Sequence, residues 1–230
     1  MIKKTNEIAY FFGILLCALG VTLSAKSGFG VSMVVAPAYV LHRFLSQFLP
    51  WFSFGVAEYA LQGALILCLA LALRRFKWKY LFSFVTAVLY GFCVDLLRSL
   101  FGTEVYEALS GRLISGVLGA IVTALAIALL LRTYLPQQAY ELVVKEISEQ
   151  KRRPINRVKW IYDGTSLLAA IALMLVFFGG FRFDMIGPGT LILTLVNAPL
   201  IALWSKLLDK LSDFSCAAPS FRDAYLARFD

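Results

Sequence analysis

Charged and metal-ligating residues are scarce in this sequence of 230 residues, and their scarcity excludes several classes of protein. Only 16% of the residues are charged, against about 25% in an ordinary soluble domain. The chain has one histidine and four cysteines, and no cysteine pair has the spacing of a metal site. No segment resembles a nucleotide-binding loop, a zinc motif or a catalytic triad. We therefore expect no metal, no cofactor, no disulfide framework and no enzymatic activity.

Hydrophobic residues make up 60% of the chain, and its mean hydropathy is +0.78. They gather in runs of the roughly 20 residues that a helix needs to cross a bilayer. We predict an all-α polytopic membrane protein with six transmembrane helices, forming a single membrane domain over 1–230 with a cytoplasmic tail at 209–230. A signal peptide is the rival interpretation of the first run, but its apolar region would span only about 7–15 residues. The expected spans are 8–25, 54–73, 80–101, 113–131, 158–178 and 191–208.

Two shorter segments interrupt this series of spans. The first, 28–50, carries Gly28 and Gly30, which break an apolar run, and Ser32 is expected to cap a short helix after them. This segment is short for a crossing, so we predict a re-entrant or interfacial helix on the outer side. The second, 136–153, has apolar residues on one face and Glu and Lys on the other. That pattern is typical of a helix on the cytoplasmic membrane surface or against other helices.

The basic residues predict the orientation of the chain. With the N-terminus inside, six spans place seventeen Lys and Arg residues on the cytoplasmic side and five outside. Such a bias favours a protein of the bacterial cell membrane with both termini in the cytoplasm. It also explains the net charge of +8 and the pI of about 9.4 without any nucleic-acid partner.

A weak internal repeat relates the two halves, about 8–101 and 112–208. At an offset of 106, Gly13 aligns with Gly119 and Lys26 with Arg132, while the acids Glu58 and Asp163 align at an offset of 105. Each half reads as a span, a short helix and two further spans. Three crossings in each half would invert one half relative to the other. Chance alignment of apolar sequence is the alternative.

Glycine and acid spacings in both halves also carry a resemblance to a known family. The residues are Gly13, Leu19, Gly20, 28–32, Gly91, Asp95, Lys159, Asp163, 187–190 and Pro199. On these residues, which cover roughly 10–210, the chain resembles the YczE-like bacterial integral membrane proteins, usually grouped with YitT. The resemblance implies a polytopic membrane fold without an established activity, for which transport is a common guess. Pro37 comes later than the family's usual proline, and Pro188 between two glycines is unusual.

Polar residues inside or beside the spans are the candidates for a site, because burying them in a bilayer is costly. Asp95 and Arg98 share a helix face and are expected to pair, either structurally or in a site. Glu58 and Asp163 are expected in the first turns of their spans, where an acid also suits the helix dipole. Interhelical hydrogen bonds and turn packing are the alternatives for the other candidates. The predicted substrate-binding residues are Gly28, Gly30, Ser32, Glu58, Asp95, Arg98 and Asn197, and the predicted cytoplasmic gate is Lys159 with Asp163.

These features favour a transporter for a small solute, coupled to an ion, with its site between the two halves. The helix after the first break would offer free N–H groups to an anionic part of the solute. The alternative is a non-transporting accessory, assembly or regulatory membrane protein that docks a cytoplasmic partner through 136–159. The expected partners are the lipid bilayer, an unknown small solute or ion, and a homo-oligomer or cytoplasmic protein, with no nucleic acid.

Overall fold

The described residues of the computed structural model are 6–74, 76–133 and 135–211, and they form eight helices and no strand. Six of these helices are long and apolar enough to cross a membrane, so the all-α polytopic fold and its six spans are confirmed. The elements are α1 (Asn6–Ser27), α2 (Ala36–Leu45), α3 (Phe54–Leu73), α4 (Trp78–Phe101), α5 (Leu109–Leu130), α6 (Ala139–Lys151), α7 (Ile155–Phe178) and α8 (Pro188–Leu211).

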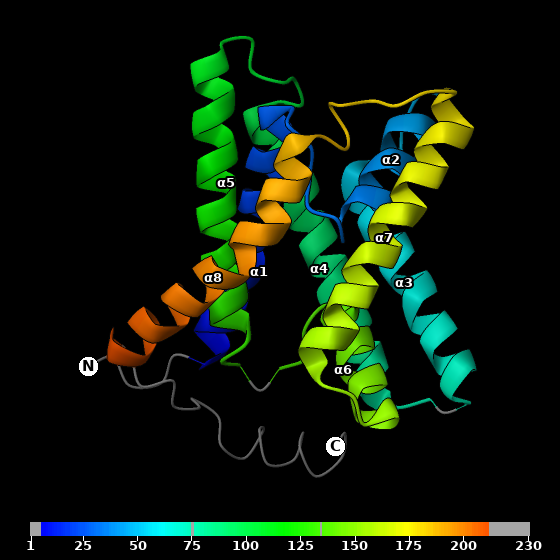
Figure 1. Cartoon of the computed structure of the whole chain (residues 1–230), viewed down its shortest axis with the longest axis vertical. Helices are drawn as coiled ribbons and strands as arrows, with labels where there is room; N and C mark the ends of the chain where they lie inside the picture. The colour runs from blue at the N-terminus through cyan, green and yellow to red at the C-terminus, as the bar shows by residue number, and fades with distance from the viewer. Residues whose placement is uncertain (1–5, 75, 134, 212–230) are drawn as a thin grey trace.

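The long helices alternate in direction, so α1 begins and α8 ends at the same end of the molecule, while α2 and α6 lie at opposite ends (Figure 1). Several helices extend beyond the predicted apolar runs, because helical hydrogen bonding does not stop where the apolar residues stop. The predicted tail, 209–230, begins inside α8, and its residues 212–230 lie outside the described part of the chain.

The helix after the first glycine break is shorter than expected, and the prediction that Ser32 caps it was wrong. Its N-cap is Val35, without a side-chain cap, and Pro37 occupies the first turn, where its missing N–H costs nothing. The carbonyl of Ser32 instead accepts hydrogen bonds from the N–H groups of Val35 (3.1 Å) and Ala36 (2.9 Å). The ten residues of α2 span about 15 Å, about half of a bilayer's hydrocarbon core.

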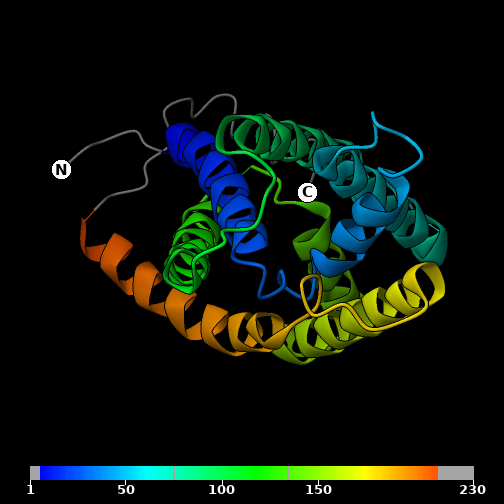
Figure 2. The ribbon, with the colours of Figure 1, turned by 90° about the horizontal axis from the view of Figure 1, so that it is seen from above.

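Two antiparallel helices that are far apart in the sequence, α1 and α5, lie side by side along the molecule (Figure 2). Gly20 and Gly119 face each other where they cross. A Cβ atom on Gly20 would lie 2.8 Å from the backbone nitrogen of Thr123, and one on Gly119 would lie 2.9 Å from the carbonyl oxygen of Gly20. The two glycines therefore allow a closer backbone approach than any side chain would permit.

The short helix α6 packs against α3, α4 and α7 rather than lying free at a surface. Its apolar face buries Leu142 and Val143 against Ile66 and Leu69 of α3. Glu146 points into this contact, where it is 3% exposed, and it pairs with Lys77 at 2.8 Å and Lys79 at 2.5 Å. Of the two predictions for segment 136–153, a helix on the membrane surface or a helix packed against other helices, the second is therefore correct.

The last two helices pack against different neighbours. α8 packs along α5, and α7 packs against α2 and α6, but no extended packing joins α7 to α8 within the described residues. In Figure 1 the two helices slant in the same direction, and the connection at 179–187 spans the distance between the end of α7 and the start of α8 at the upper end of the molecule. Because α3 and α4 are closely packed, the last two helices of each predicted half are arranged differently.

Candidate functional site

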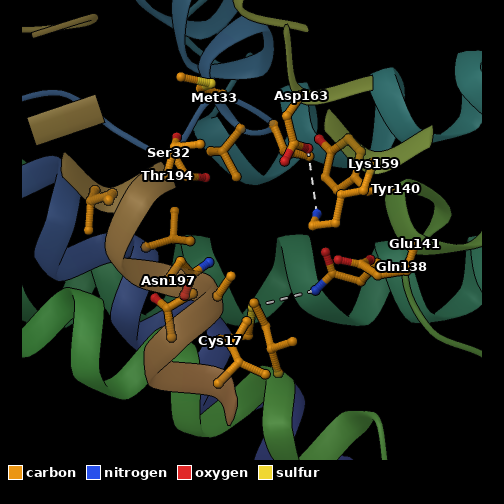
Figure 3. A pocket seen from close by; sticks show the side chains of 18 of the residues that line it. Cys17, Ser32, Met33, Gln138, Tyr140, Glu141, Lys159, Asp163, Thr194 and Asn197 are labelled. Atoms are coloured by element: carbon orange, nitrogen blue, oxygen red, sulfur yellow. Dashed lines mark hydrogen bonds and ion pairs between the residues drawn. The ribbon is translucent and has the colours of Figure 1, made fainter. Parts of the chain in front are cut away.

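A cavity of about 320 Å³ lies inside the molecule, between residues of both halves of the sequence. Its walls come from α1, α4, α5, α6, α7 and α8 and from the turn that precedes α2. Figure 3 shows the labelled polar side chains arranged around it. Of the predicted site residues, the cavity brings together Ser32, Lys159, Asp163 and Asn197.

One wall of the cavity carries charges from α6 and α7. The predicted pair of Lys159 and Asp163 forms, with Nζ 3.5 Å from Oδ1, because residues four apart share a helix face. Glu141 of α6 lies on the same wall (Figure 3). Burial raises the pKa of the Glu141 carboxyl, nearby Lys159 opposes that shift, and the negative charge of Asp163 adds to it.

The opposite wall carries hydroxyl and amide groups. Asn197 and Thr194 of α8 lie across the cavity from Tyr140 and Glu141 (Figure 3). The Oδ1 atom of Asn197 is buried and has no hydrogen-bond partner among the described residues. A buried acceptor without a partner is costly, so this atom is a specific indication that the cavity receives a hydrogen-bond donor.

Glu58 lies one side chain behind the wall of the cavity rather than in it. It is fully buried in α3, and Tyr140, which lines the cavity, donates a hydrogen bond from its hydroxyl to Glu58 Oε2 at 2.9 Å. Gln62 donates to the same oxygen at 3.4 Å, and Oε1 has no partner within the described chain. Neither Glu58 nor Asp163 lies in a first turn as predicted, because α3 begins at Phe54 and α7 already at Ile155.

Asp95 and Arg98 lie outside the cavity, and the predicted ion pair between them does not form. The Asp95 carboxylate accepts hydrogen bonds from the hydroxyl of Ser53 and from the backbone N–H of Gly55, at 2.8 Å for the latter. It thus satisfies free groups at the start of α3. The Arg98 guanidinium is buried over the ring of Phe54, 5.3 Å from its centroid.

Gly28 and Gly30 also lie outside the cavity, and both have a positive φ, 64° and 97°. Between them, the carbonyl of Phe29 accepts a hydrogen bond from Gly189 at 3.0 Å, so the two glycine breaks pack directly on each other. A Cβ on Gly30 would lie 2.6 Å from the backbone nitrogen of Gly187. Contrary to the prediction from the sequence, the first N–H groups of the helix after this break are not free to bind a solute. The carbonyl of Ser32 already accepts hydrogen bonds from the N–H groups of 35 and 36.

Sequence analysis missed the contribution of α6 to the cavity, which is made by Gln138, Tyr140 and Glu141. The amphipathic pattern of 136–153 assigned the acids to an outward face. A weaker feature of the sequence does indicate their position in the cavity wall. Tyr140 and Glu141 adjoin the apolar positions 139, 142 and 143, and so they border the buried face of α6. Only the packing of α6 against α3 and α7 turns them inward.

The fold and the cavity define a multi-pass α-helical membrane protein with a cavity lined by helices from both halves of the chain. The chain belongs to the family of unknown function DUF6198, whose sequence model matches residues 4–206. It is similar to the "Uncharacterized protein YyaS" of Bacillus subtilis (strain 168), with 24% identity over 202 residues, covering 87% of this chain and 92% of that protein. No solved structure matches the chain significantly.

Proposed function

We propose that this protein is a transporter of a small solute, coupled to an ion, and that the cavity is its binding site. The observation that carries the proposal is the cavity itself: polar groups from both halves meet in a space of about 320 Å³ among apolar helices. Ionisable residues inside membrane spans are rare because they are costly, and they mark solute and ion pathways. A transport site between two halves near the middle of the membrane is the common arrangement in secondary transporters.

The proposal includes an inverted repeat of 8–101 and 112–208. At the offset of 106, exchanging the halves turns a contact between Gly20 and Gly119 into one between Gly13 and Ala126. Both contacts exist: a Cβ on Gly13 would lie 3.4 Å from the carbonyl oxygen of Ala126. Antiparallel packing of α1 and α5 gives such reciprocity by itself, so it agrees with a two-fold axis between the two helices but is not separate support for one.

The aligned cations Lys26 and Arg132 occupy similar places in the two halves. Lys26 ends α1 and donates to the carbonyl of Phe101 at the end of α4, at 2.7 Å. Arg132 follows α5, donates to the carbonyl of Ser205 near the end of α8, and pairs with Asp209 at 2.5 Å. Each cation thus binds close to the C-terminal end of the last span in its half, where a positive charge suits the helix dipole.

Alternating access would use a place where the two proposed halves differ. The pair α3 and α4 is packed, and the equivalent pair α7 and α8 is spread apart beside the cavity. Exchanging these two arrangements would close the present opening and create one on the other side. We place the protein in the bacterial cytoplasmic membrane with both termini inside. The finer resemblance to YczE-like and YitT-related proteins stays a prediction.

Uptake into proteoliposomes, measured with a panel of labelled metabolites and ions, tests the proposal. We expect at least one solute to accumulate, and we expect Asp163→Asn to reduce its uptake at least about tenfold while the protein stays folded. Asp184→Asn is the matched control, because Asp184 forms an exposed pair with Arg43 away from the cavity. Folded wild-type protein that moves no solute in the panel, and is stabilised by none, would instead favour an accessory or regulatory role.

A further inference from the structure

We infer that the solute carries a protonated amine, which enters the cavity as a hydrogen-bond donor and a positive charge. This inference rests on the proposed function and names the substrate class of the same site. It stands on three independent properties of the cavity: the sign of its charges, the kind of atom left without a partner, and the composition of its walls.

Two carboxyl groups and one ammonium group line the cavity, so its charges sum to a negative value when both carboxyl groups are ionised. Lys159 is engaged with Asp163 at 3.5 Å, which leaves Glu141 without a cation of its own in the described residues of the wall. A bound cation favours the ionised form of a nearby carboxyl. An anionic solute would instead face two carboxyl groups in a cavity among apolar helices, where repulsion between like charges is screened less than in bulk water.

The cavity wall holds one buried side-chain atom without a hydrogen-bond partner in the described chain, Asn197 Oδ1, and it is an acceptor. The other two such atoms, Glu58 Oε1 and Thr22 Oγ1, belong to residues outside the lining of the cavity. The hydroxyl of Tyr140 is already used as a donor toward Glu58. Gln138 Nε2 reaches only the sulfur of Cys17, at 3.7 Å. A solute with several N–H donors satisfies such a site, whereas a solute rich in acceptors leaves its oxygens unpaired.

The remaining walls suit an organic cation rather than a bare metal ion. Tyr90, Tyr140 and Trp160 line the cavity, and aromatic rings attract ammonium groups at their faces. The volume of about 320 Å³ is at the small end of ordinary ligand pockets, about 300–1,000 Å³. Apolar side chains cover much of the rest, and they suit a short hydrocarbon part; they include Val21, Ile127, Leu130, Leu193 and Ile201.

Four probes separate the properties of the ligand: benzylamine, benzyl alcohol, benzoate and tetramethylammonium. The first three share one ring and differ in charge, and the fourth is a cation without N–H donors. We expect benzylamine to bind the purified full chain saturably and to raise its melting temperature. Benzyl alcohol and benzoate should do neither, and tetramethylammonium should bind more weakly than benzylamine because it leaves Asn197 unpaired.

Two variants tie the binding to the cavity. Glu141→Gln and Asn197→Ala should each weaken benzylamine binding by about tenfold or more, as the loss of a charge-assisted hydrogen bond predicts. Glu149→Gln is the matched control, because Glu149 lies exposed on the same helix. Equal or tighter binding of benzoate or benzyl alcohol, or benzylamine binding that survives both variants, would overturn the inference. Uptake of an anionic or neutral solute that depends on Asp163 would overturn it while leaving the transport proposal intact.

Discussion

The carboxylate of Asp95 on α4 accepts a hydrogen bond from the backbone N–H of Gly55, at 2.8 Å, in the first turn of α3. The same carboxylate accepts from the hydroxyl of Ser53, whose oxygen in turn accepts the N–H of Val56 at 3.1 Å. An acid of one span therefore completes the N-terminal cap of its neighbour. Asp95 therefore has a structural role at the start of α3, and the acids that line the cavity are Glu141 and Asp163.

Removing this acid should reduce stability without changing the cavity. In Asp95→Ala the N–H of Gly55 loses its partner in a partly buried place, so we expect the free energy of unfolding to fall by about 1–3 kcal/mol. Thermal unfolding in detergent measures the loss. Uptake per folded molecule should stay near that of the wild type. A selective loss of uptake with an unchanged melting temperature would mean that Asp95 belongs to the binding site.

The glycine contact between α1 and α5 predicts a steric effect. Gly20→Ala places a methyl group 2.8 Å from the nitrogen of Thr123 and 2.1 Å from its hydroxyl oxygen, so the helices must separate. We expect a loss of about 1–3 kcal/mol in the free energy of unfolding. Gly164→Ala is the control, because a Cβ there meets no atom within 4 Å, and better helix propensity should add about 0.5–1 kcal/mol. Equal melting temperatures for the two variants would contradict close packing at Gly20.

The buried acid of α6 predicts a dependence of stability on pH. Burial raises the pKa of Glu146, but hydrogen bonds and charge from Lys77 and Lys79 outweigh burial and hold it below the usual value. The ionised form therefore contributes stability above the ordinary glutamate pKa, and this contribution disappears as the pH falls through the lowered value. Glu146→Gln should lower the free energy of unfolding by about 2 kcal/mol at pH 7.

At a pH below the lowered pKa, the wild type and Glu146→Gln should unfold alike, because the wild-type carboxyl is then also uncharged. Glu149→Gln, exposed on the same helix, should change little at either pH. Melting curves of the three proteins at both pH values provide the measurement. A deficit of Glu146→Gln that persists in acid would mean that shape rather than charge holds α6 in place.

The charge bias predicts the direction of every connection. Reporter fusions at Lys77, Gly102, Gln150 and Asp184 should read inside, outside, inside and outside, because these positions lie alternately at the two ends of the molecule (Figure 1). Gln150 is the most informative of them, since its connection has the most basic residues and should resist translocation. An outside reading at Gln150 would contradict the proposed orientation.

Sequence predicted the parts of this protein that depend on composition along one helix. Apolar runs located the six spans, and the four-residue spacing of Lys159 and Asp163 predicted their pair. It failed where the partner lies on another helix: Asp95 was matched to Arg98 beside it in sequence, whereas its partners are in the first turn of α3. The acids of α6 were placed outward for the same reason, because helix periodicity alone does not say which neighbour covers a face.

The lack of extended packing between α7 and α8 would make the surrounding lipid part of the proposed binding site. In a bilayer, hydrocarbon tails would occupy the space that a packed helix pair would fill, and they would then border the cavity beside Leu193 and Ile201. The length and saturation of those tails then act on solute affinity as a side-chain substitution would. In a detergent micelle the same polypeptide presents a chemically different pocket, so its affinity for a given solute depends on the amphiphile that surrounds it.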